Sequence, residues 1–171
     1  MMGFLFSDDG IRIAKADVIL SGIALTSGPH GYQPSFAEII EGTLLFTFAD
    51  LKAAFARPEF AKHVLSGVSG VVRPDFSFSD GGDNRLRVTG SIDFLGRRFQ
   101  LSASSRVRIE GRRLVVSAAQ VEGLPMLGAI PVQVMDFSLP LSMPEGTALT
   151  GVTVVPDGLL VKFEGKDKKL G

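Results

Sequence analysis

The most regular pattern in the chain is an alternation of apolar and polar residues between Phe76 and Val121. Over residues 85–94 the apolar side chains occupy mostly even positions, and over residues 97–110 they occupy mostly odd positions. A period of two is typical of strands that bury one face and expose the other. This part of the sequence therefore predicts a meander of amphipathic antiparallel strands.

Two similar turns, each a glycine followed by two arginines, separate these strands. Glycine at the first central position of a two-residue turn favours a type II′ hairpin. The predicted registers pair Phe94 with Phe99 and Ile109 with Leu114, with Gly96 and Gly111 at positive φ. Each pair brings apolar residues together, and a slip of one residue would reverse the faces.

A third hairpin is expected around Asp157-Gly158, a dipeptide typical of type I′ turns, and would pair Val154 with Val161. Two more strands are expected at about residues 11–25 and 39–48. The proline-rich segment 124–144 is expected to be a loop or short helix, and the first ten or so residues and the polar tail 166–171 are expected to fray.

One helix is predicted over residues 49–66, where Leu51, Phe55 and Phe60 recur at helical spacing. Pro58 would either start a second segment or kink the helix. The predicted fold class is α+β and β-rich, with an antiparallel twisted meander sheet wrapped around one long or kinked helix. The whole chain, residues 1–171, is expected to form a single domain.

Charge and composition narrow the function classes. The formal net charge is zero and there is no cysteine, so disulfides are excluded and no global field favours nucleic acid. No apolar run reaches the length of a membrane-spanning helix. Acidic residues interrupt the apolar start of the chain, which is unlike a signal peptide. The sequence as given therefore predicts a cytoplasmic location. If a leader has been removed, the predicted location is extracytoplasmic.

Catalytic patterns are scarce. The two histidines, His30 and His63, are not spaced with carboxylates as metal ligands are. Ser69 comes near a Gly-x-Ser-x-Gly nucleophile motif but does not complete it. The sequence therefore predicts a protein that is not an enzyme and that needs neither a metal nor another cofactor.

Arginines dominate residues 85–113, and the predicted register places Arg87 opposite Arg106 and Arg85 opposite Arg108. Like charges directly opposite each other destabilise a sheet. Either nearby acids such as Glu110 neutralise a solvated face, or the face contacts an anionic membrane surface. The candidate contact residues are Arg87, Arg98, Arg106 and Arg108.

The opposite, apolar face leaves two alternatives. It could form a filled core, as in a structural or protein-interaction module, or it could line an elongated pocket for an apolar ligand. A homo-oligomer is compatible with either. The candidate lining residues are Leu51, Phe55, Phe60, Phe94, Phe99, Leu101, Val107, Ile109, Leu114 and Val116.

Several segments resemble the bacterial LmeA-like phospholipid-binding family, a relative of tubular lipid-binding (TULIP) domains. They are Gly111–Val116 (GRRLVV), Val121–Pro125 (VEGLP), Leu139–Gly146 (LPLSMPEG) and Gly151–Val161 (GVTVVPDGLLV). Met143 stands where the family has a second leucine, and the helix opening at Ala49-Asp50-Leu51 is similar as well. The order of these motifs follows the family over roughly residues 16–170.

This resemblance implies a fold and a function. The implied fold is a TULIP-like half-barrel, in which a long twisted sheet wraps around a helix and leaves an apolar groove for lipid chains. The implied function is non-enzymatic binding or transfer of a phospholipid-like ligand, with a lipid or membrane surface as the partner. The family supplies no catalytic residues to carry over to this chain.

Overall fold

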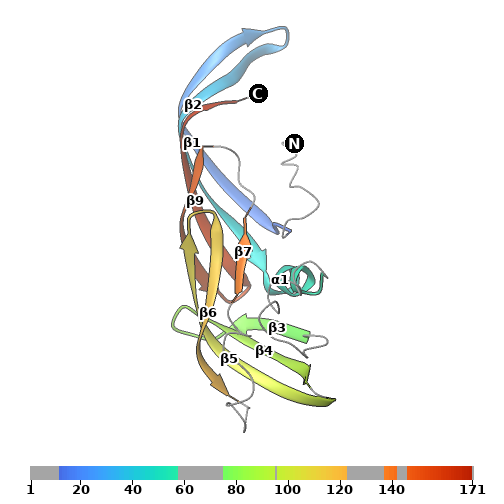
Figure 1. The fold of residues 1–171 in the computed structure, drawn as a ribbon. Coiled ribbons are helices and arrows are strands. Elements are labelled where there is room, and N and C mark those ends of the chain that lie inside the picture. The colour runs from blue at the N-terminus through green and yellow to red at the C-terminus, as the bar shows by residue number, and fades with distance from the viewer. Residues whose placement is uncertain (1–11, 58–74, 95, 123–136, 142–145, 171) are drawn as a thin grey trace.

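The computed structural model describes residues 12–57, 75–94, 96–122, 137–141 and 146–170. Within these residues it contains two antiparallel sheets and one helix (Figure 1). The elements are β1 (Lys15–Gly28), β2 (Gly31–Thr47), α1 (Phe48–Phe55), β3 (Asp75–Asp80), β4 (Arg85–Phe94), β5 (Arg97–Glu110), β6 (Arg113–Glu122), β7 (Phe137–Pro140), β8 (Thr147–Val155) and β9 (Gly158–Lys169).

The first sheet has the order β1-β2-β9-β8. β1 and β2 form a long hairpin that turns at Pro29-His30, and β9 runs along β2 for most of its length. The expectation that residues 166–171 fray is wrong for 166–169, because β9 extends to Lys169 and Lys166 pairs with Ile39. Backbone pairing with β2 holds this polar end in place.

The second sheet is the predicted meander, in the order β3-β4-β5-β6-β7. The hairpin at Gly111 has the predicted register, with Ile109 opposite Leu114 and Gly111 at φ 59°. The strand β7 lies within the segment expected to be a loop or short helix, and it pairs with β6. The rest of that segment, residues 123–136 and 142–145, lies outside the described residues.

The hairpin at Gly96 differs from the prediction by two residues. Phe94 pairs with Arg97, and Ile92, not Phe94, pairs with Phe99. Gly96 does have positive φ, at 74°, but it directly precedes Arg97, the first residue of β5. The turn therefore closes one position earlier on each strand than a type II′ turn beginning at Gly96 would. A shift of two residues keeps every side chain on its predicted face.

The last hairpin differs in the same way. Val155 pairs with Gly158 around Pro156-Asp157, so Val154 faces Leu159, not Val161. In a type I turn, proline favours the first of the two central positions, and glycine favours the fourth position, directly after the central pair. The Pro-Asp-Gly order thus outweighs the preference of Asp-Gly for the two central positions.

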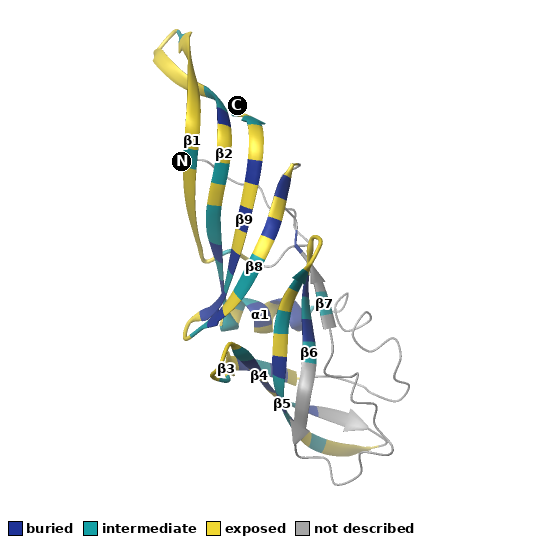
Figure 2. Cartoon of the chain, turned by 90° about the vertical axis from the view of Figure 1, so that its left-hand side faces the viewer, coloured by how far each residue is buried: buried dark blue, intermediate teal, exposed yellow. Residues whose placement is uncertain are grey.

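Two sheets replace the single wrapped sheet that the sequence predicts. The described part of the predicted helix is α1, which has eight residues, while the continuation with Pro58 and Phe60 lies outside the described residues. The core lies where α1 and the two sheets meet, since α1 packs on β3 and β2, and β5 contacts β8 (Figure 2).

Candidate functional site

The predicted lining residues gather in the core between the two sheets. Phe60 lies outside the described residues, and for Phe94 only the backbone is described. The others belong to one apolar cluster or pack against it: Leu51, Phe55, Leu101, Leu114 and Val116 are buried, and Phe99, Val107 and Ile109 are partly buried. The structure therefore brings together the described members of the set, although one hairpin register differs.

The helix α1 is fixed at its start by a capping interaction. Thr47 Oγ1 accepts a hydrogen bond from the backbone N–H of Asp50 at 3.1 Å and donates one to Asp50 Oδ2 at 2.6 Å. This cap satisfies a helix N–H that would otherwise lack a partner. It sets α1 directly at the end of β2, with Leu51 and Phe55 turned into the core.

The buried face of α1 packs mainly on β3. The rings of Phe55 and Phe78 have centroids 5.1 Å apart at an interplanar angle of 46°, and Lys52 Nζ donates to Ser77 Oγ at 3.2 Å. A tilted aromatic pair at this distance is a favourable arrangement. These contacts hold α1 across one end of the apolar face.

The margin of this core is apolar but incompletely covered. The partly buried apolar residues that pack against the cluster are Ile13, Ile40, Phe48, Phe99, Val107, Ile109 and Val152. They come from both sheets, from the start of α1 and, for Ile13, from the segment before β1. Such a rim can accept further apolar surface, such as an acyl chain, without a polar group being buried.

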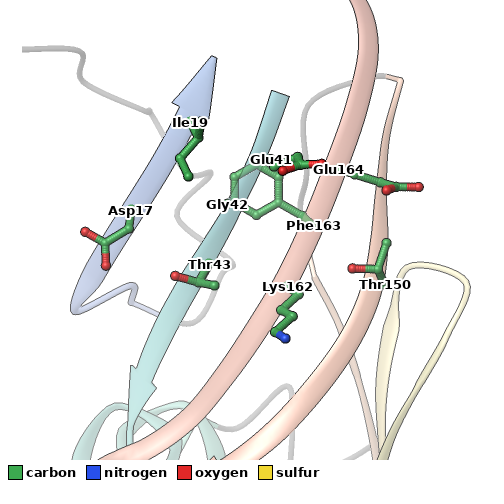
Figure 3. Close-up of a pocket in the computed structure, with 9 residues that line it drawn as sticks. All are labelled: Asp17, Ile19, Glu41, Gly42, Thr43, Thr150, Lys162, Phe163 and Glu164. Carbon is green, nitrogen blue, oxygen red and sulfur yellow. The ribbon is translucent and has the colours of Figure 1, made fainter. Parts of the chain in front are cut away.

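A separate hollow of about 320 Å³ lies over the first sheet (Figure 3). Its lining residues lie side by side on paired strands. In one such row, Asp17 of β1 lies opposite Thr43 of β2, and Thr43 lies opposite Lys162 of β9. Gly42 contributes no side chain there, and the ring of Phe163 lies so close that Cζ would be 2.6 Å from a Cβ at Gly42. The lining residues are Asp17, Ile19, Glu41, Gly42, Thr43, Thr150, Lys162, Phe163 and Glu164.

The charge of this hollow disfavours a phosphate group. Asp17, Glu41 and Glu164 bring three carboxylates against the single ammonium of Lys162. Asp17 also forms an exposed ion pair with Lys15 at 3.0 Å, a kind of contact that adds little stability. An anionic lipid headgroup would be repelled here, so the hollow is a poor candidate for a phospholipid headgroup site.

The four candidate arginines are exposed and share one face of the second sheet. The predicted partners are wrong by the same two-residue shift: Arg85 lies opposite Arg106, and Arg87 lies opposite Ser104. Glu110 accepts from Arg108 Nε at 2.7 Å, and Ser117 Oγ accepts from Arg108 Nη1 at 2.8 Å. Neutralisation by Glu110 is thus present at Arg108.

The histidines and acids do not form a recognisable metal centre in the described residues. His30 is exposed at the turn between β1 and β2, and His63 lies outside the described residues. Among residues the structure describes, no group of three or more His, Cys, Asp or Glu side chains could hold a metal ion. In the same residues, no helix is long and apolar enough to cross a membrane.

Sequence reasoning missed the exposed apolar side chains of the β1–β2 hairpin. A signal for them exists, because the chain from Val18 to Ala37 has no Asp, Glu, Lys or Arg. The large apolar residues exposed on β1 and β2 are Val18, Ile19, Ile23, Leu25, Tyr32 and Ile39, all but Ile39 within this uncharged stretch.

Comparisons with known proteins give one result. Neither curated proteins nor solved structures yield a match. A family model described as LmeA-like phospholipid-binding matches residues 3–164, nearly the whole chain of 171 residues. The protein belongs to the LmeA-like phospholipid-binding family.

Proposed function

We propose that this protein binds or transfers a phospholipid whose acyl chains lie in an apolar groove between the sheets and α1. The observation that carries the proposal is the set of partly buried apolar residues, from both sheets and the start of α1, that packs against the core. Membership of a phospholipid-binding family supports a lipid as the ligand.

The driving force for binding is the removal of acyl methylene groups from water, about 0.8 kcal/mol for each buried CH₂. Val107 and Ile109 on β5 would meet such a chain, since they are only partly covered by the core. Deeper positions such as Leu114 and Val116 are fully buried and would form the floor. The headgroup would remain outside the apolar rim, because burying an unpaired phosphate is costly.

We also propose that binding is not coupled to a chemical reaction. The residues proposed to line the groove are aliphatic and aromatic, and such side chains supply no general acid, base or nucleophile. Substitution of His30 is expected to leave lipid binding unchanged, because His30 lies at an exposed turn away from the core.

A binding titration with a phospholipid that carries a fluorescent acyl chain tests this proposal. Val107→Asn places a polar group at the rim and should weaken binding, since an unpaired polar group in an apolar site costs roughly 1–3 kcal/mol. Thr89→Asn, at an exposed position of β4, is the matched control and should bind as the unchanged protein does. Thermal unfolding of both variants shows whether they are folded.

The result that contradicts the groove is a folded Val107→Asn variant with full lipid binding. A different outcome, in which the unchanged protein binds no phospholipid at all, would favour the alternative function. That alternative is a β-rich structural or interaction module with a filled core, and the fully buried Leu51, Leu86 and Leu159 are the observation on its side.

A further inference from the structure

The end of the β1–β2 hairpin projects beyond the rest of the first sheet (Figure 1), and most of its residues are exposed (Figure 2). Several of these exposed residues are apolar. Ile23 is 46% exposed, Leu25 58% and Tyr32 78%. Single exposed apolar residues are ordinary on protein surfaces, but a contiguous group marks an interaction site. Here the group belongs to two paired strands, with Ser27 opposite Tyr32 and Leu25 opposite Pro34.

This hairpin end also lacks the charges that normally protect an exposed edge. β1 is an edge strand of 14 residues. Soluble proteins usually place charged residues on such an edge to prevent association. Between Val18 and Ala37 there is no Asp, Glu, Lys or Arg on either strand. The surface is therefore suited to an apolar or interfacial environment.

Charged residues begin again where β9 joins the hairpin. Lys166, Lys168 and Lys169 pair with Ile39, Ala37 and Phe36 of β2. Glu38 and Asp167 lie at the same level, so the lysines outnumber the acids there. An uncharged apolar end bordered by lysines is complementary to a bilayer whose surface is anionic.

We propose that the β1–β2 hairpin end is a membrane-docking element that inserts into the interface of an anionic phospholipid bilayer. Leu25 and Tyr32 lie on the turn side of the lysine rows and enter the interface. Ile23 lies in the row of Lys168, where Lys166 and Lys169 contact lipid phosphates. This inference goes beyond the proposed lipid groove and does not rest on it, because the hairpin end and the core are separate surfaces.

Flotation with lipid vesicles tests the docking element directly. The unchanged protein should float with vesicles of phosphatidylcholine and phosphatidylglycerol, and less with phosphatidylcholine alone or at high salt. Leu25→Asp should reduce this binding roughly tenfold or more, because a leucine side chain is no longer removed from water and a charge must approach the acyl region. Thr89→Asp, an equally charged change at an exposed position of β4, is the control and should bind normally.

A spectroscopic probe reports insertion separately from mere attachment. The chain has no tryptophan, so Tyr32→Trp provides a single fluorophore at the hairpin end. Its emission should shift to shorter wavelength with anionic vesicles and be quenched by brominated acyl chains. An unchanged emission spectrum in vesicle-bound protein would overturn insertion of this end.

Two other outcomes would also overturn the inference. The first is normal vesicle binding by Leu25→Asp together with loss of binding in an Arg87→Gln, Arg106→Gln double variant, which would assign membrane contact to the arginine face. In the second, the unchanged protein self-associates without lipid in a concentration-dependent way, Leu25→Asp abolishes this association, and neither protein binds vesicles. That result would make this surface an interface between copies of the chain. Lipid bound in the groove can be measured on the same variants, so failure of docking and failure of the groove are distinguishable.

Discussion

Gly158 lies opposite Thr47, where β9 meets the last residue of β2. A Cβ at this position would overlap the carbonyl oxygen of Phe46 and lie 2.8 Å from Thr47 Cα. Both obstacles are backbone atoms, so a side-chain movement cannot relieve the clash. The absence of a side chain is what allows β9 to pair with the last residue of β2.

Replacement of Gly158 by alanine is therefore expected to destabilise the fold by about 1–3 kcal/mol or more, the range for overpacking. Gly151→Ala is the matched control in β8, since nothing lies within 4 Å of a Cβ there and the change should be close to neutral. Urea unfolding of the two variants measures the difference. Equal stabilities would show that the close approach has no energetic consequence.

Ser105 is a polar residue in an apolar environment. It is fully buried on the inner face of β5, opposite Leu86, and among the described residues its Oγ has no hydrogen-bond partner. An unsatisfied buried hydroxyl is costly, whereas an alanine of similar size makes no such demand. Ser105→Ala is expected to leave the free energy of unfolding unchanged or raise it. A loss above about 1 kcal/mol would mean that the hydroxyl has a partner in solution.

At the scale of elements, Asn84 joins the two sheets. Its side-chain Oδ1 accepts a hydrogen bond at 2.7 Å from the backbone N–H of Val154, on the edge strand β8. Asn84 has φ 56°, a conformation that asparagine tolerates better than most residues do. The tight turn before β4 thus satisfies a backbone donor of the other sheet.

Asn84→Ala should cost roughly 1–3 kcal/mol, because it leaves the partly buried N–H of Val154 without its acceptor. Asn84→Asp retains an acceptor oxygen and should keep most of the stability. Hydrogen exchange at the Val154 amide checks the mechanism, with faster exchange expected in the alanine variant alone. Unchanged protection of that amide in Asn84→Ala would contradict the link.

The hairpin registers show how much of the strand pairing can be predicted from the local sequence. The register at Gly111 agrees with the prediction because Gly111 and Arg112 take the two central positions of the turn, with Glu110 opposite Arg113. At Gly96 and at Asp157 two placements, differing by two residues, keep the same faces buried. The apolar pattern cannot distinguish them, since a shift of two restores every side chain to its face. The choice depends on turn geometry, such as Pro156 preceding Asp157.

The same parity argument explains why the inner apolar set was predictable while the hairpin end was not. Leu101, Val107 and Leu114 stay on the inner face under either register. Between Val18 and Leu20 three apolar residues follow one another, so no alternation assigns a buried face there. Gly22, Pro29 and Pro34 also interrupt the pattern, although residues 15–47 form one continuous hairpin.

For the whole molecule, the division into two sheets could not be predicted from the pattern of apolar and polar residues. It depends on β9 returning to pair with β2, strands that are far apart in the chain. Local alternation specifies which face of a strand is buried but not which distant strand lies beside it. The consequence is functional, because the pairing carries the lysines at the end of β9 to the uncharged end of the β1–β2 hairpin.

Native mass spectrometry of the purified, unchanged protein tests most directly whether the partly buried apolar rim of the core holds a phospholipid. We expect a species heavier than the protein alone by the mass of one phospholipid. It should be released on collisional activation and be absent or reduced in folded Val107→Asn. A bare protein mass after exposure to phospholipid vesicles, with the protein folded, would contradict the groove and leave the core as a filled one.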